Sequence, residues 1–303
     1  MSPPEFRLNH EVVETPPRPS ATVLLLRDGA RGLEILMQRR HDDTDAFGGA
    51  YVFPGGKVDR EDSDDDMLER IDVPSEALHA ALCDPEIGQA MAAAFYVAAA
   101  RETFEEAGVL LATMVDGAPV GPMQAELARR LSREGYAFIE VLESLKLRLT
   151  VSTLMAWSRW VTPKMPSVTR KRFDSRFFLA RAPAGQVATH DNHEATDSVW
   201  LNPRQAIAMY GAGEIMLAAP QLMSLVELAA HGGVEAAMRP QAHRWPRRID
   251  PQPFEYEGAR GVAYPGDERH SDPERAMPGP TCLIFRNGRF EPIEGLASLL
   301  AGG

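Results

Sequence analysis

The segment that most restricts the fold of this chain is an alanine-rich stretch that runs from Gly88 to Ala107. It contains no proline and, after its first residue, no glycine, and alanine has the highest intrinsic helix propensity. The stretch therefore predicts one long helix, and Gly108 stands where a left-handed C-terminal cap belongs. Runs typical of strands flank it: ATVLLLRDG and LEILMQRR before it, and TLMAWSRWVTP, RFDSRFFLARAP and SVWLNP after it. The first two runs predict a hairpin, and the interleaved order predicts an α/β (α+β) sandwich.

The chain divides into three parts by composition. Residues 1–19 are polar and proline-rich, and we expect a flexible N-terminal arm. Residues 20–239 carry the helix and strand patterns, including helical patterns over 121–149 and in PRQAIAMYG and PQLMSLVELAAHGG, and form the expected main domain. Residues 240–303 form a C-terminal extension, proline-rich with few periodic runs before CLIFRNGRFEPI. That last run predicts a hairpin with its turn at Asn287-Gly288, packed on the same domain.

Charge and cysteine content exclude several classes of protein. The net charge of −11, without a basic stripe, argues against a nucleic-acid partner. No apolar run approaches the ~18–20 residues of a membrane span, and the first residues lack the apolar region of a secretory signal. Cys83 and Cys282 are too few for a disulfide framework or a paired metal knuckle. We therefore expect a cytoplasmic protein with two reduced thiols.

The chemistry-bearing pattern lies at the end of the predicted helix, in Arg101-Glu102-Thr103-Phe104-Glu105-Glu106. On a helix, Glu102 lies three and four positions before Glu105 and Glu106, so the three carboxylates share one face. Such like charges destabilise a helix unless something offsets them. A hard divalent cation with oxygen ligands, Mg²⁺ or Mn²⁺, would do so. By themselves the carboxylates are more typical of a solvated acidic helix end.

A glycine pair stands upstream in Phe53-Pro54-Gly55-Gly56-Lys57-Val58-Asp59. Two glycines allow a tight turn and a close approach of backbone to a ligand, although a glycine pair alone is most often a simple turn. The residues that follow, DREDSDDD at 59–66, are strongly acidic. The expected structure for that run is a solvated surface loop.

Taken together, FPGGKVD and RETFEEAGV resemble the Nudix box. That pattern is a glycine, five residues, a glutamate, seven residues, then Arg-Glu-apolar-x-Glu-Glu-x-Gly-apolar. Gly56 matches the leading glycine, and the second half of the box is matched by Arg101, Glu102, Glu105, Glu106, Gly108 and Val109.

The box departs from the pattern in three places. Asp62 stands where a glutamate is expected, and its role stays open because the alignment beyond it is not fixed. The gap from Asp62 to Arg101 is 38 residues instead of seven, so an insertion splits the box; we place it at about 62–87, as a candidate lid or homodimer contact. Thr103 replaces the usual apolar residue. The interrupted box resembles the Nudix-19-like branch, whose animal members cleave coenzyme A, and the likeness extends from Ala21 to Ala208.

The resemblance implies a Nudix-type α/β/α sandwich with a mixed sheet, one helical insertion and one C-terminal extension. It implies one to three divalent cations, Mg²⁺ or Mn²⁺, held by Glu102, Glu105 and Glu106. Arg101 would orient the glutamates through an ion pair, and Gly55 and Gly56 would shape the loop and offer a backbone carbonyl. Many members also use an acidic residue from a later loop; of Asp191, Glu194 and Asp197 we favour Glu194. The implied catalytic set is therefore Glu105, Glu102, Arg101 and Glu194.

Arginines near the predicted strand ends are candidates for substrate phosphates, because guanidinium forks match phosphate oxygens. We select Arg39, Arg40 and Arg172 for this role, although each alone is more typical of a surface or strand-edge residue.

The expected function is metal-dependent hydrolysis of a diphosphate in a nucleotide-like small molecule. The resemblance points to coenzyme A or an acyl-CoA, giving 3′,5′-ADP and a 4′-phosphopantetheine product. Three alternatives stay open at this point. They are a diphosphate isomerase, a catalytically silent Nudix-fold sensor, and a pyrophosphohydrolase for nucleotide sugars, dinucleotides or nucleoside triphosphates.

Overall fold

The computed structural model describes residue 9 and residues 11–41, 48–165, 171–189, 195–239 and 246–300. Its centre is a mixed eight-stranded sheet with the order β10-β7-β8-β1-β2-β3, in which β4 also pairs with β1 and β9 with β2. Its strands are β1 (Arg18–Gly29), β2 (Gly32–Arg40), β3 (Tyr51–Val52), β4 (Gly55–Lys57), β7 (Met155–Val161), β8 (Phe173–Arg181), β9 (Ala195–Leu201) and β10 (Arg247–Ile249). The pairs β1–β8 and β7–β10 are parallel, and the other pairs are antiparallel.

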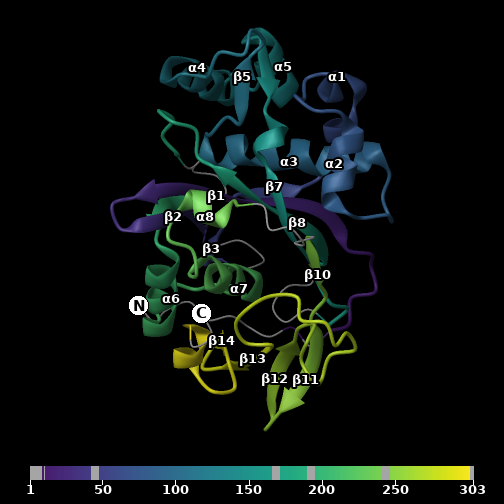
Figure 1. Ribbon diagram of the computed structural model, residues 1–303, viewed down its shortest axis with the longest axis vertical. Coiled ribbons are helices and arrows are strands. Elements are labelled where there is room, and N and C mark those ends of the chain that lie inside the picture. Colours follow the sequence, from purple (N-terminus) through teal and green to yellow (C-terminus); the bar gives the residue numbers. More distant parts are fainter. Residues whose placement is uncertain are drawn as a thin grey trace.

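Helices cover both faces of this sheet (Figure 1). One layer, at the top of the view, holds α1 (Asp65–Leu68), α2 (Ser75–Leu82), α3 (Gln89–Ala107), α4 (Pro122–Arg133) and α5 (Phe138–Ser144). The other face carries α6 (Pro203–Ala212), α7 (Ala219–Leu228) and the short α8 (Val234–Ala237). Short 3-10 turns lie at Arg60–Ser63, Val151–Thr153 and Leu296–Leu300. The expected α/β/α sandwich with a mixed sheet is confirmed.

Burial on both faces explains the continuous apolar run of β1. Val23 and Leu25 join the core on the α3 side, whereas Leu24 and Leu26 join the core on the α7 side. A strand that is covered on both faces reads as an unbroken hydrophobic segment instead of an alternating one. The predicted β1–β2 hairpin closes as Gly29 pairs with Gly32.

The long helix α3 is buried on nearly all sides, since 14 of its 19 residues are buried. Its alanines let the neighbouring elements approach closely while the residues keep high helix propensity. Gly108 ends it in the left-handed conformation with φ 64°, as predicted. Thr103, the polar residue at an apolar position of the box, is fully buried, and its hydroxyl donates to the carbonyl of Ala99 at 2.7 Å. That local hydrogen bond is what allows a threonine there.

Two expectations need correction. The acidic run 59–66 is not entirely a solvated loop, because Asp62 is only 1% exposed. The helical pattern over 121–149 ends early: Leu147–Leu149 form β6, which pairs with β5 (Ala112–Met114). A partner more than thirty residues away in sequence decides that assignment, and local helix propensity does not reveal it.

The C-terminal extension also holds more structure than its proline content suggests. Besides β10, it forms a second sheet, β11-β12-β13-β14, from β11 (Gln252–Tyr256), β12 (Ala259–Ala263), β13 (Cys282–Arg286) and β14 (Arg289–Glu291). The last two strands are the predicted hairpin, with positive φ at Asn287 and Gly288. The three strands β10, β11 and β12 were not predicted. The sheet packs below α6 and α7 in Figure 1.

Candidate active site

The last turns of α3 and the glycine strand β4 meet to form the candidate site. β4 pairs with the start of β1, Thr22 opposite Gly55 and Ala21 opposite Gly56. This pairing fixes the glycines in front of α3. The Gly55 N–H donates to the Glu106 carboxylate at 2.8 Å, so the helix and the loop are joined directly.

Each glycine is required for a separate steric reason. Gly55 has φ +155°, and a Cβ there would lie 2.3 Å from the carbonyl oxygen of Ala21. At Gly56 a Cβ would lie 2.3 Å from Oε1 of Glu102. The first position is closed by backbone and the second by a carboxylate, so the loop lies directly against the acidic face of α3.

Arg101 is the centre of the charge arrangement. Its guanidinium forms a two-pronged pair with Asp62, Nε to Oδ1 at 2.8 Å and Nη2 to Oδ2 at 2.9 Å. Nη1 donates to both Glu102 and Glu105, each at 2.9 Å. Nη2 also reaches the carbonyl oxygen of Lys57 at 2.9 Å. One buried cation therefore orients the helix carboxylates and anchors the chain on the far side of the loop.

The electrostatics of the cluster favour positive charge, because they keep Arg101 protonated and oppose ionisation of Glu105. Burial by itself would lower the pKa of Arg101, but the ion pairs with Asp62, Glu102 and Glu105 outweigh it and raise that pKa above its ordinary value. Burial raises the pKa of Glu105 in spite of the opposing Arg101 charge. Of the two glutamates that accept from Arg101 Nη1, Glu105 is the more exposed. Its side chain is 41% exposed, against 13% for Glu102.

Asp62 is the residue whose role the sequence left open. It forms the buried end of the Arg101 pair, and Asp59 lies 3.5 Å from the same guanidinium. The sequence feature that could have identified Asp62 is its position six residues after Gly56, the position of a glutamate in the Nudix box. The insertion begins after this position and does not change the spacing. Asp62 also closes the short turn before it by accepting from the Asp59 N–H at 2.8 Å.

Gln38 is a second residue that the sequence did not single out. It is buried on β2, and its Nε2 donates to the Glu106 carbonyl oxygen at 2.8 Å. The carbonyls in the last turn of a helix lack partners within the helix, so Gln38 supplies one. Glu106 is consequently fixed at its backbone by β2 and at its carboxylate by β4.

The donor set fits a hard divalent cation. Four carboxylates, those of Asp59, Asp62, Glu102 and Glu105, surround a single arginine, and the Glu106 carboxylate lies at the adjoining glycine loop. Hard cations take such oxygen ligands. Over the described ranges, however, no three His, Cys, Asp or Glu side chains stand arranged to hold a metal ion. The carboxylates of the site bind Arg101 and the Gly55 N–H instead. A magnesium ion needs only one or two of them, because it keeps several waters and uses substrate phosphates.

The remaining candidates are less closely grouped. Arg39 and Arg40 end β2, where Arg39 pairs with Tyr51 of β3, so they flank the chain that enters the glycine loop. Arg172 lies elsewhere: it donates to the carbonyls of Thr162 and Thr15 and so holds the N-terminal segment. Glu194 and Asp191 fall outside the described residues. Asp197 is described; it lies opposite Arg39 in the β2–β9 ladder, 3.5 Å from the Tyr51 hydroxyl.

No helix in the described part of the chain is long and apolar enough to cross a membrane.

Comparison with known proteins gives a consistent result. The chain is 29% identical over 231 residues to the acyl-coenzyme A diphosphatase NUDT19 of Gallus gallus, with 64% of this chain and 61% of that protein aligned. It is 28% identical over 231 residues to the Homo sapiens protein of the same description, with 66% and 61% aligned. The chain thus matches about three-fifths of the length of these relatives.

A solved structure agrees with this result. The crystal structure of a NUDIX hydrolase from Alicyclobacillus acidocaldarius superposes with a TM-score of 0.61 at 28% identity, covering 75% of this chain and 98% of that one. A family model described as the NUDT19 Nudix domain matches residues 12–228. That match spans well over half of the sequence, and the chain belongs to the NUDT19 Nudix family.

Proposed function

We propose that this protein is a divalent-metal-dependent hydrolase that cleaves the diphosphate linkage of coenzyme A or an acyl-CoA. The observation that carries the proposal is the carboxylate cluster around Arg101, held directly against the Gly55–Gly56 loop. Three acidic side chains on one helix face offer oxygen ligands of the kind that a hard cation prefers, and the glycine loop brings backbone close to them.

The carboxylates of Glu102, Glu105 and Glu106, with a backbone carbonyl of the glycine loop, would hold Mg²⁺ or Mn²⁺. Such a cation, when bound, supplies charge that offsets a diphosphate and favours attack of water on phosphorus. Arg101 keeps Glu102 and Glu105 in place through ion pairs of 2.9 Å each. We assign acceptance of the water proton to a carboxylate, either Glu105 in this cluster or Glu194 of the later loop.

The choice of substrate rests on relatives. Proteins described as acyl-coenzyme A diphosphatases match about two thirds of this chain at 26–29% identity. Cleavage of the corresponding diphosphate here would release 3′,5′-ADP and 4′-phosphopantetheine or its acyl form. Arg39 and Arg40, at the end of β2 beside the glycine loop, are the arginines best placed for substrate phosphates.

A metal-dependent hydrolysis panel tests the proposal. Coenzyme A, acyl-CoAs, NADH, ADP-ribose, diadenosine polyphosphates and nucleoside triphosphates are incubated with Mg²⁺ or Mn²⁺, and products are identified by mass. We expect 3′,5′-ADP from the CoA compounds only with metal. Cleavage of another compound in preference would replace the substrate, and silence across the panel with folded protein would favour a binding module.

Site variants complete this test. Glu105→Gln and Glu106→Gln are each expected to lower turnover about a hundredfold or more with the fold retained, because each removes a proposed metal ligand. Glu126→Gln is the matched control, since that glutamate contacts only arginines of its own helix α4 among the described residues. Near wild-type turnover in both site variants would contradict the ligand assignment.

A further inference from the structure

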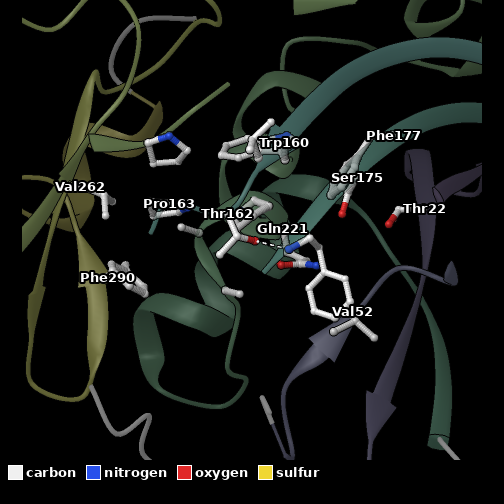
Figure 2. A pocket seen from close by; sticks show the side chains of 16 residues that line it. Thr22, Val52, Trp160, Thr162, Pro163, Ser175, Phe177, Gln221, Val262 and Phe290 are labelled. Carbon is white, nitrogen blue, oxygen red and sulfur yellow. Dashed lines mark hydrogen bonds between the residues drawn. The ribbon is translucent and has the colours of Figure 1, made fainter. Parts of the chain in front are cut away.

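A cavity, shown in Figure 2, is lined by residues of the core on the α7 side of the main sheet, among them Trp160, Phe177 and Val262. Its volume is about 210 Å³, and its walls come from β1, β3, β7 and β8, from the start of α7 and from the C-terminal sheet. Residues that represent these walls are Thr22, Trp160, Phe177, Gln221, Val262 and Phe290. A cavity of about 150 Å³ is enough to hold benzene, so this one has room for a somewhat larger group.

The cavity is apolar but holds two unsatisfied polar atoms. No described residue that lines it carries a charge; most are aliphatic, aromatic or proline. Two of them have a buried polar atom without a hydrogen-bond partner in the described structure, the donor Nε1 of Trp160 and the acceptor Oε1 of Gln221. Trp160 is only 5% exposed. Since buried polar atoms are nearly always paired, a donor and an acceptor left open in one cavity point to a ligand.

The cavity adjoins the glycine loop across one strand. Thr22, a lining residue, is the β-ladder partner of Gly55, and paired strands lie about 4.8 Å apart. Phe53 of the FPGG segment stacks edge-on against the lining residue Phe177, with ring centroids 6.5 Å apart. A molecule bound at the glycine loop therefore has this cavity within reach of a flexible chain.

We propose that the cavity binds one amide-bearing segment of the uncharged acyl-pantetheine arm of the substrate, with Trp160 and Gln221 pairing with the secondary amide of that segment. This inference rests on the proposed function. An amide carbonyl accepts from the indole N–H and an amide N–H donates to the Gln221 oxygen, so each open atom finds a complement. The adenosine end of coenzyme A carries a 3′-phosphate, and these uncharged walls offer no cation for it.

The C-terminal extension completes this site. Pro251, Val262 and Phe290 line the cavity and lie beyond residue 228, where the match to the family model ends. The extension therefore forms one wall of the cavity, which under this proposal gives it a role in substrate binding.

The test measures binding of S-hexanoyl-pantetheine, which has the arm but no diphosphate, by titration calorimetry without metal. Gln221→Leu removes the open acceptor and is expected to weaken binding about three- to tenfold, the effect of one hydrogen bond. Ala219→Leu fills the cavity from the start of α7 and is expected to weaken it at least tenfold. Gln205→Leu and Ala208→Leu, at exposed positions of α6, are the matched controls and leave binding unchanged.

The outcomes separate the two proposals. Binding of the arm, weakened by the cavity variants and accompanied by a higher KM for hexanoyl-CoA, supports the cavity assignment. If coenzyme A is hydrolysed but the arm binds equally to all four variants or to none, the cavity assignment is wrong and the proposed function stands. If the arm binds as expected but no CoA compound is cleaved, the hydrolase proposal fails alone. An effect of Gln221→Leu on 3′,5′-ADP binding instead would assign the cavity to the base and overturn the inference.

Discussion

At the scale of single residues, the candidate site depends on one cation among several carboxylates. Asp62 is the buried partner of Arg101, whereas Asp59, at 3.5 Å from the same guanidinium, has 55% of its side chain exposed. A buried ion pair is expensive to break from one side, because the remaining charge stays desolvated. An exposed and longer pair contributes little because water and ions screen it. The two aspartates therefore differ in importance although they are close in sequence.

We expect Asp62→Asn to lower the free energy of unfolding by about 3–5 kcal/mol and to reduce turnover, because Arg101 loses its anchor. Asp59→Asn, the matched control, is expected to change the free energy of unfolding by about 1 kcal/mol or less. Urea unfolding of both variants measures this. Equal effects of the two substitutions would contradict a dominant role for the buried pair.

The two glycines of the loop should separate stability from activity. Ala at position 55 meets backbone and a positive φ, so Gly55→Ala is expected to destabilise the fold. Gly56→Ala meets only the end of the Glu102 side chain, which can rotate away. That variant is therefore expected to keep its melting temperature within a few degrees and to lose most of its turnover. Full activity in folded Gly56→Ala would show that the Glu102 position does not matter.

At the scale of elements, the insertion between the halves of the Nudix box is tied to the sheet by charge. Asp84, between α2 and α3, pairs with Arg176 of β8 and lies 3.0 Å from Arg159 of β7. Arg159 also holds Asp174 at 2.8 Å, and Arg176 lies over the Phe95 ring at 4.4 Å. This network fixes the entry to α3, the helix that carries the carboxylates. The insertion is therefore held against the sheet and is not a loosely attached loop.

The network predicts acid sensitivity. Burial opposes ionisation of Asp84, but Arg159 and Arg176 outweigh it and lower the pKa of its carboxyl. The pKa of an aspartate in an unfolded chain is about 3.9. A carboxyl whose pKa is lower than this in the folded state stabilises the fold at pH values above about 3.9. This contribution is lost as the pH falls through the pKa of the folded state.

We therefore expect Asp84→Asn to be less stable than wild type by about 3 kcal/mol at pH 7, with the difference shrinking as pH falls below about 4. Denaturant unfolding from pH 7 to pH 2.5 measures it. Glu86→Gln is the control, because the Glu86 side chain is largely exposed. Its distance of 3.4 Å from Arg159 is also longer than the 3.0 Å of Asp84. A difference that stays constant with pH would contradict the assigned charge of Asp84.

At the scale of the whole molecule, the main domain and the extension share a core. Ile249, Val262, Leu283 and Phe290 of the extension are buried in the same cluster as the α6 and α7 residues. The Tyr210 hydroxyl donates to the Phe290 carbonyl at 2.6 Å, and β10 pairs in parallel with β7. We propose that residues 246–300 fold with the Nudix region as one cooperative unit.

Phe290→Ala tests whether the extension and the Nudix region unfold together. Removing a buried phenyl ring is expected to cost about 3–5 kcal/mol. In one cooperative unit, the entire unfolding transition, followed both by far-ultraviolet circular dichroism and by tryptophan fluorescence, shifts together. A separate early transition, with the remainder unchanged, would show that the extension is an independent domain.

The sequence alone determined the elements whose signals are local and strong. The helix over 89–107 followed from its alanines, the β1–β2 hairpin from two apolar runs about a turn, and the last hairpin from Asn287-Gly288. The Nudix assignment followed from residue types at fixed spacing on a helix and a glycine turn.

Only the tertiary structure decided what depends on distant partners. The strand β11 contains Pro253, a residue that argues against a strand in the sequence. It lies at the edge of its sheet, where a missing N–H is tolerated, so residue propensities did not predict it. The burial of Asp62 against Arg101, 39 positions away, exists only once α3 packs on β4. The cavity behind the glycine loop likewise needs both the sheet and the extension. Local preference fixes a helix or a turn, but long-range packing decides which charges are buried and which polar atoms are left for a ligand.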